Sequence, residues 1–311
     1  MQVEQPLFTI ATVTYNSGKW VKQAIESVLA SSYTSFEYII ADDCSSDDTW
    51  KIVCEYNDTR IVSFRQRHNM GEYANRNSVI NAAKGKYLLF VDGDDVLLMH
   101  TLRNLAEYIA AFPVAQMIWG VQPSDVDFAI MPYLFESNEL MRLIYGTNIP
   151  LAVIGFAETV FRLEDLRAAG GLSERYSIGD TYIKKKLALT CNALFVPMGL
   201  VFWRRSSNQA SNRLNQDYRN FLEGYLVDCE IMDSYFAEEQ QEIAIGIKGS
   251  FIRRLLKNTL LKGKFSDFVL LYKEARLNAV DFLLLLKKYT FRYNPVERTE
   301  QPLFNNFNFF N

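Results

Sequence analysis

The residues that most constrain this chain are 86–95, with the sequence KYLLFVDGDD. Tyr87–Val91 is an unbroken apolar run without helical spacing, which predicts a strand buried on both faces. The run ends in three carboxylates and one glycine, Asp92–Asp95, here called the acidic segment. On an extended backbone Asp92 and Asp94 project to the same side, where they repel each other unless a cation lies between them.

Oxygen ligands of this kind suit Mg²⁺ or Mn²⁺. The acidic segment therefore predicts a divalent metal site formed by Asp92, Asp94 and Asp95, although an acidic turn without a ligand would give the same pattern. Gly93 has no Cβ, so a bulky anion such as a diphosphate could approach the backbone there.

The composition excludes several classes of protein. The chain has 311 residues, 49% of them hydrophobic and 14% aromatic, which indicates one large globular domain or two smaller ones. A net charge of −3 argues against a nucleic-acid-binding protein. The four cysteines form no C-x-x-C pair, and the N-terminus carries acid where a signal peptide needs base. No stretch approaches the length of a membrane span, so we expect a reducing, cytoplasmic location.

Apolar strand patterns alternate with helical ones through the first part of the chain. Strands are predicted at 8–15, 36–41, 60–64, 87–91 and 115–119, with helices between them, and this order is typical of an open α/β sheet with mostly parallel strands. Ligands of such sheets bind beyond the carboxyl ends of the strands. Tyr15, Asp42, Asp43 and the acidic segment all follow strand ends, so we expect them to share one edge.

Four motifs in this region resemble family 2 glycosyltransferases. The strand ending in Tyr15-Asn16 is similar to the family's opening strand, and DDCSSD at 42–47 to its Asp-Asp-x-Ser-x-Asp loop. Residues 69–87 resemble its Asn-x-Gly…Ala-Arg-Asn…Ala-x-Gly-x-Tyr run, with one extra residue before Arg76. The acidic segment resembles its D-x-D site. The resemblance is close over about the first hundred residues and looser to about Ser207, and it implies a GT-A fold, a Rossmann-like sheet flanked by helices.

The resemblance also implies roles at the matching positions. Tyr15, with Thr14 and Asn16 beside it, would bind the nucleotide by stacking on its base, and Asp43, with Asp42, would accept a hydrogen bond from that base. Asp92 and Gly93 would lie near the ribose and diphosphate. Asp94, with Asp95, would hold the cation, and Arg76 would support the nucleotide or the acidic segment.

Each of these residues also has an ordinary structural interpretation. Tyr15 could pack at the end of its strand, and one of Asp42 and Asp43 could cap the following helix. Arg76 could form a salt bridge on an exposed helix.

A second group of chemical residues follows in 170–182. GGLSE at 170–174 resembles the family's Gly-Gly-Phe-x-Glu loop, which precedes an acidic residue at the start of a helix on the acceptor side. Most members carry Glu-Asp there, whereas this chain has Gly179-Asp180, so the resemblance leaves Asp180 as the catalytic base. A helix N-terminus keeps an aspartate ionised and able to accept a proton. The alternative is a plain N-cap.

Arg204 and Arg205 resemble the family's closing segment, where an arginine folds over the diphosphate. Many relatives also offer a histidine nearby as a metal ligand. Here His68 and His100, the two histidines of the chain, lie in other segments.

The pattern becomes helical beyond about Leu214, and the charge is segregated there. Residues 248–298 carry twelve Lys or Arg and four Asp or Glu, a surplus of eight positive charges. An apolar stripe accompanies them at Phe251, Leu255, Leu256, Leu260 and Leu261. The segment could lie on an anionic membrane surface, pack on the catalytic domain or serve as a homodimer interface.

These observations predict a GT-A catalytic domain at 1–210, with nucleotide-sugar binding in 1–100 and the acceptor side in 101–210. A helical extension at 211–300 and a flexible tail at 301–311 would follow. The expected activity is inverting transfer of a sugar from a nucleotide-diphosphate donor, most simply a UDP-sugar, to a hydroxyl of a glycan or lipid-linked acceptor in bacterial surface polysaccharide synthesis. The alternatives are a sugar-phosphate nucleotidyltransferase and a non-catalytic scaffold. No G-x-G-x-x-G follows the first strand, which disfavours dinucleotide binding.

Overall fold

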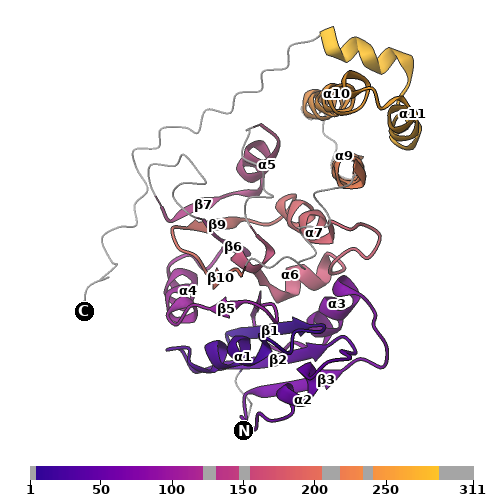
Figure 1. Ribbon diagram of the computed structural model, residues 1–311. Helices are drawn as coiled ribbons and strands as arrows, with labels where there is room; N and C mark the ends of the chain where they lie inside the picture. The colour runs from indigo at the N-terminus through magenta and orange to yellow at the C-terminus, as the bar shows by residue number, and fades with distance from the viewer. Residues whose placement is uncertain (1–4, 122–130, 147–154, 205–217, 234–240, 287–311) are drawn as a thin grey trace.

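Figure 1 shows the computed structural model, which describes residues 5–121, 131–146, 155–204, 218–233 and 241–286. Its centre is an eight-stranded sheet with the order β3-β2-β1-β4-β8-β6-β9-β7. The strands β1 (Phe8–Thr14), β2 (Phe36–Asp42), β3 (Ile61–Arg65) and β4 (Tyr87–Phe90) are parallel, as are β6 (Met117–Gly120) and β9 (Ala193–Val196). β8 (Thr159–Arg162) and β7 (Tyr133–Phe135) run antiparallel to their neighbours. The predicted α/β class with mostly parallel strands is confirmed.

Helices cover both faces of this sheet because each strand is apolar on both sides. Along β1, Phe8 and Ile10 belong to one hydrophobic cluster and Ala11 and Val13 to the other. The first cluster packs against α1 (Val21–Leu29) and α4 (Thr101–Ala111), and the second against α3 (Glu72–Ala82), α5 (Ser137–Gly146), α6 (Leu163–Ala168) and α7 (Gly179–Ala188). The short helices α2 (Thr49–Val53) and Phe156–Glu158 and a two-stranded sheet, β5 (Val96–Leu97) with β10 (Val201–Phe202), complete this part.

The later helices form a small bundle with a core of its own. It contains α9 (Tyr218–Asp233), α10 (Gln241–Asn258), α11 (Phe265–Glu274) and the 3₁₀ segments Leu260–Lys262 and Ala279–Leu286. The ring of Phe251 stacks on Phe221 and Tyr225, with centroids 4.6 and 4.1 Å apart. In Figure 1, α9 lies beside α7, between the sheet and the rest of the bundle. No helix among the described residues is long and apolar enough to cross a membrane.

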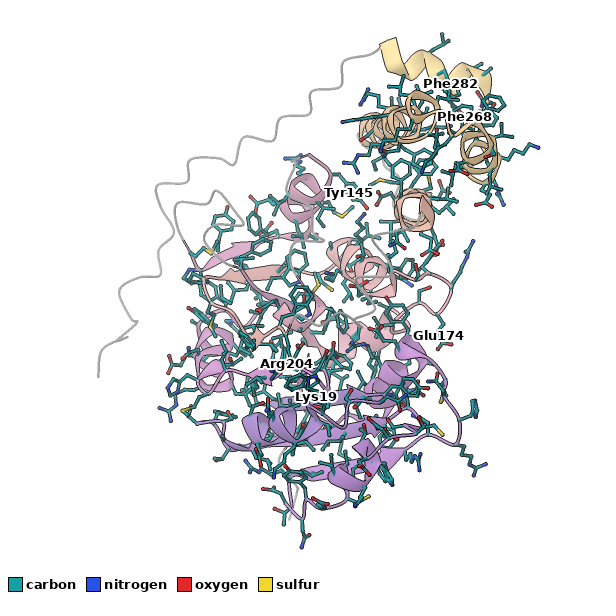
Figure 2. The ribbon with its side chains drawn as sticks, viewed as in Figure 1. Lys19, Tyr145, Glu174, Arg204, Phe268 and Phe282 are labelled. Carbon is teal, nitrogen blue, oxygen red and sulfur yellow. The ribbon has the colours of Figure 1, made fainter. Side chains whose placement is uncertain are left out.

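The bundle corrects one prediction about the apolar stripe. Phe251 and Leu255 are buried in the bundle core, at 3% and 0% exposure, so this part of the stripe packs inside the protein and does not face a membrane. Leu261 has the opposite environment and is 81% exposed. Aromatic rings also pack together in the bundle between α11 and the segment Ala279–Leu286. Figure 2 labels Phe268 and Phe282, whose ring centroids lie 6.4 Å apart.

Candidate active site

The carboxyl ends of β1, β2 and β4 meet at one edge of the sheet. The backbone N–H of Asp43 donates to the carbonyl of Thr14 at 2.9 Å, and that of Gly93 donates to Val13 at 3.1 Å. The sequence segments that follow the three strands are therefore held against each other by main-chain hydrogen bonds. The structure brings Tyr15, Asp43 and the acidic segment together as the sequence predicts.

The acidic segment is a turn and not the extended strand end that the spacing of its carboxylates predicted. β4 ends at Phe90, and the N–H of Asp95 donates to the carbonyl of Asp92 at 2.9 Å. The structural reason for glycine at position 93 also differs from the predicted one, which was the approach of an anion. A Cβ at this position would lie 2.6 Å from Oγ1 of Thr14, so glycine is required by the contact with β1.

Arg76 is buried beneath this turn. Its guanidinium pairs with Asp92 at 2.8 Å and with Glu72 at 3.0 Å, and it lies over the rings of Phe90 and Phe156 at 5.0 and 4.9 Å. The interpretation of Arg76 as part of an exposed salt bridge is wrong, since the residue is 3% exposed. Burial raises the pKa of Asp92 in spite of the opposing charge of Arg76.

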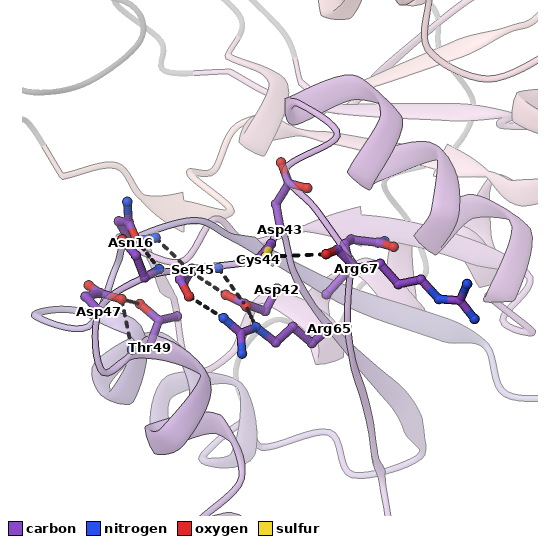
Figure 3. Close-up of polar contacts among 12 residues, drawn as sticks. Asn16, Asp42, Asp43, Cys44, Ser45, Asp47, Thr49, Arg65 and Arg67 are labelled. Atoms are coloured by element: carbon purple, nitrogen blue, oxygen red, sulfur yellow. Dashed lines mark hydrogen bonds and ion pairs between the residues drawn. The ribbon is translucent and has the colours of Figure 1, made fainter.

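Asp42, the last residue of β2, and Asp43, which follows it, organise the neighbouring loop (Figure 3). Asp42 is fully buried, pairs with Arg65 at 3.2 Å and accepts the N–H of Ser45 at 3.0 Å. Asp43 accepts the N–H groups of Met70 and Gly71 at 2.7 and 2.9 Å. Both carboxylates thus fix the backbone that surrounds the strand ends.

The prediction that Asp42 or Asp43 caps the next helix is wrong. Asp47 accepts the N–H of Thr49, the first residue of α2, at 3.0 Å and that of Gly18 at 2.9 Å. This contact links the loop after β2 to the loop after β1.

Tyr15 and its neighbours lie above the strand ends. Tyr15 is 50% exposed, so the interpretation that it packs at the strand end is not supported. Asn16 has a φ of 52°, and its side-chain oxygen accepts the N–H of Ser46 at 2.8 Å. Among the described residues, the buried Oγ1 of Thr14 has no hydrogen-bond partner.

Arg204 ties the acidic segment to α1 (Figure 2). Its backbone N–H donates to Asp95 at 3.0 Å and its Nε donates to the carbonyl of Asp94 at 2.8 Å. The same guanidinium donates to Gln23 at 2.8 Å and lies 4.1 Å from the ring of Trp20. The guanidinium of Arg204 therefore binds Asp94 and Gln23 of the protein, whereas the sequence predicted that it would contact the diphosphate. Arg205 lies outside the described residues.

Asp180 lies in the first turn of α7. Its negative charge contributes to the raised pKa of Asp92, so the two carboxylates lie within electrostatic reach although they are far apart in the sequence. A Cβ on Gly179 would lie 2.5 Å from the carbonyl oxygen of Ser173 and 3.0 Å from the ring of Tyr73. A side chain at this position would therefore clash with its neighbours, and glycine avoids the clash.

The carboxylates of this region fit a divalent cation. Burial and the charges of Asp92 and Asp94 raise the pKa of Asp95 to about 7, which shows that three negative groups crowd together. Within the described parts of the chain there is no group of three or more His, Cys, Asp or Glu side chains that could hold a metal. A cation here would thus take one or two carboxylates, with Asp94 foremost, and complete its shell with water and phosphate oxygens.

The sequence analysis missed several residues that contact the site. One of them, Glu72, has a recognisable signal, because it lies four residues before Arg76 on a helix. Arg65, Trp20, Gln23 and Tyr73 were not predicted, since each contacts a partner from another element. The contact between Arg204 and Gln23, for example, joins residues 181 positions apart.

The fold and the arrangement of this edge define a GT-A glycosyltransferase domain. Residues 9–162 match the profile of glycosyl transferase family 2, and this domain belongs to that family. A beta-1,3-glucosyltransferase of Escherichia coli, WfaP, which acts on alpha-D-GlcNAc-diphosphoundecaprenol with UDP-Glc, is 33% identical over 103 residues, 33% of this chain and 41% of that protein. The chain spans between 39% and 56% of the length of the first curated relatives it matches.

Solved structures agree on the fold. Staphylococcus aureus TarS 1-349 in complex with UDP-GlcNAc superposes with a TM-score of 0.60 at 18% identity, covering 86% of this chain and 90% of that one. The mannosyltransferase PcManGT of Pyrobaculum calidifontis in complex with GDP-Man and Mn²⁺ also gives 0.60, at 17% identity, covering 91% and 79%. Both matches extend beyond residues 1–210, so the GT-A likeness includes part of the helical bundle.

Replacing Arg76 with methionine should destabilise the protein by about 1–3 kcal/mol, because the buried Oδ1 of Asp92, whose side chain is 33% exposed, would lose its counter-charge. Chemical denaturation should measure this loss, and Lys22→Met, at a side chain 67% exposed, should change stability by less than about 0.5 kcal/mol. Adding Asp92→Asn to the Arg76 variant should restore part of the stability. Additive losses in the double variant would contradict the coupling.

Proposed function

We propose that this protein is an inverting glycosyltransferase that moves a sugar from a nucleoside-diphosphate donor to an acceptor hydroxyl. The observation that carries the proposal is that α3 contacts two groups from distant parts of the chain. Arg76 of α3 pairs with Asp92 of the acidic segment, and Tyr73 of α3 packs against Gly179, the residue before Asp180. Membership of the domain in family 2 supports the same chemistry.

The donor would bind at the edge formed by β1, β2 and β4. The exposed ring of Tyr15 would stack on the base, and Asp43 still has free lone pairs for a base N–H after accepting two backbone groups. Asp92 would approach the ribose and Asp94 the diphosphate. Arg76 would act indirectly by holding the acidic segment. In this assignment residues 1–100 bind the donor and 101–210 face the acceptor.

Asp180 would act as the general base. It lies in the first turn of α7, and its carboxylate would take the proton of the acceptor hydroxyl as that oxygen attacks the anomeric carbon. The bond to the nucleoside diphosphate breaks in the same displacement, which inverts the anomeric centre. A divalent cation bound at Asp94 would supply Lewis-acid stabilisation of the leaving diphosphate.

We propose a UDP-sugar as the donor and a glycan or lipid-linked sugar of a bacterial surface polymer as the acceptor. The names of two similar proteins support this choice, since WfaP acts on a diphosphoundecaprenol-linked sugar and the TarS structure contains UDP-GlcNAc. A lipid-linked acceptor would place the reaction at the cytoplasmic face of the membrane.

One region of the helical bundle suits such a surface. Leu261 and Phe265 are 81% and 66% exposed, and they lie next to the exposed Lys262 and Lys264. More exposed cations follow the same helices, at Arg253, Arg254, Lys257, Lys273 and Arg276. Apolar side chains flanked by lysines bind anionic lipid headgroups by insertion and charge together. We propose that this end of the bundle contacts an anionic membrane surface.

Asp94→Ala should weaken UDP binding in the presence of Mn²⁺ by about tenfold or more, which corresponds to ~1.4 kcal/mol. Calorimetric titration with UDP, dTDP and GDP, each with Mn²⁺ or with EDTA, would measure the effect and identify the base. Asp48→Ala, an exposed carboxylate of the same region, is the matched control and should bind normally. Equal affinity of the Asp94 variant and the wild type under both conditions would remove Asp94 as the metal ligand.

Asp180→Asn should lower kcat for sugar transfer by about 10²–10⁴-fold, because the amide cannot accept the proton. The affinity for UDP should stay nearly unchanged, since the donor binds to other elements. Steady-state transfer assays with product anomer analysis by NMR would test both the base and the inversion. A parallel loss of nucleotide binding would argue against catalysis by Asp180, and release of pyrophosphate from a nucleoside triphosphate would favour the nucleotidyltransferase alternative.

Replacing Leu261 and Phe265 with serine should abolish flotation with vesicles of phosphatidylcholine and phosphatidylglycerol. The wild type should float at low salt and less so at high salt, because lysines attract anionic headgroups. Val114→Ser is the control, since Val114 is 54% exposed but lies outside the bundle. Flotation of the double variant equal to that of the wild type would contradict the proposed surface.

A further inference from the structure

Three acidic side chains of α9 contact the loop and the helix that carry Asp180. Glu223 accepts both the backbone N–H and the hydroxyl of Ser177, at 2.7 and 2.6 Å. Glu230 accepts the hydroxyls of Tyr176 and Tyr182 at 2.6 and 2.9 Å. Asp228 forms an ion pair with Lys185 and accepts the hydroxyl of Tyr145 at 3.1 Å. A helix of the C-terminal bundle therefore holds the chain on both sides of Asp180.

The opposite side of the same loop is held by α3. The hydroxyl of Tyr73 donates to the carbonyl of Ser177 at 2.9 Å, so the N–H and the C=O of Ser177 are bound from two different helices. Gly179 packs so closely on Tyr73 that a Cβ would lie 3.0 Å from the ring. Tyr73 follows Glu72, which pairs with Arg76 beneath the acidic segment.

We infer that α9 belongs to the catalytic unit and positions Asp180 through a clamp on Ser177, with Glu223 on one side and Tyr73 on the other. This inference rests on the proposed function, in which Asp180 is the general base. Glu223 and Tyr73 are positioning residues, because they hold the backbone ahead of the base.

The chemistry of the contacts suits a positioning role. Hydrogen bonds to a carboxylate are shorter and stronger than neutral ones, and Glu223 makes two of them to one residue. The hydroxyl of Tyr176 lowers the pKa of Glu230, which keeps this second carboxylate charged at neutral pH. A general base must lie within hydrogen-bond reach of its proton, and a small displacement of a catalytic group lowers the rate on the order of 10²-fold. The first helix after residue 210 would thus be needed for turnover and not for donor binding.

The test compares Glu223→Ala and Glu223→Gln with Asp233→Asn in the full-length chain. Asp233 is an exposed carboxylate at the end of the same helix and is the matched control. The alanine variant should lose about 10–100-fold in kcat, with the KM for the donor and the affinity for UDP within about twofold of the wild type. The glutamine variant, which retains one acceptor oxygen, should recover part of the rate. An unchanged kcat, or an equal loss of UDP affinity, would overturn the inference.

A second measurement does not depend on activity. Amide hydrogen exchange of residues 176–182 should be about tenfold faster in Glu223→Ala and unchanged in Asp233→Asn, because the bond from Ser177 to Glu223 is lost only in the former. Tyr73→Phe should also speed exchange there. Unchanged exchange in Glu223→Ala would overturn the proposed clamp, and this result does not require an active donor. If exchange is faster in Glu223→Ala but the wild type shows no transferase activity, the clamp stands and only the proposed function is overturned.

Discussion

The ion pair of Arg76 and Asp92 is the interaction on which this structure depends most. It places a guanidinium and a carboxylate beneath the end of the central strand, at 3% exposure for Arg76. Burying two charges is costly, and the rings of Phe90 and Phe156 offset part of that cost by packing over the guanidinium. The pair also decides which way the acidic segment faces, since Asp92 points inward to Arg76. Asp94 is less buried than Asp95.

The acidic segment is then fixed from several directions. β1 holds Gly93 by a main-chain hydrogen bond, and Arg204 holds Asp95 and the carbonyl of Asp94. The side chain of Arg204 reaches Trp20 and Gln23 on the other side of the turn. Three carboxylates that repel one another are thus kept close before any cation binds. Such preorganisation is expected of a site that stabilises charge developing on a leaving group.

The sequence predicts this fold well where the pattern is local and periodic. The strands predicted at 8–15, 36–41, 60–64 and 87–91 agree with β1, β2, β3 and β4 within one residue at each end. It predicts contacts poorly where the partners are distant. An arginine in a helix does not indicate whether it is buried, so the burial of Arg76 follows only from the packing of α3 on β1 and β2. The stripe on α10 likewise has the same periodicity whether it faces lipid or Tyr225.

The contacts of α9 show how closely the helical bundle is joined to the sheet domain. Charge and helical periodicity place a boundary near residue 210, and the bundle does have its own core. However, three of the four carboxylates of α9 contact the segment 176–185, and none of these contacts would survive if the bundle were an independent domain. The core of the bundle fixes the position of α9, and α9 in turn fixes the loop before Asp180. Apolar contacts act in the same direction, since Val227, Ile231 and Met232 of α9 are buried in the hydrophobic cluster of the sheet. Polar and apolar contacts therefore both join α9 to the part of the chain that carries Asp180.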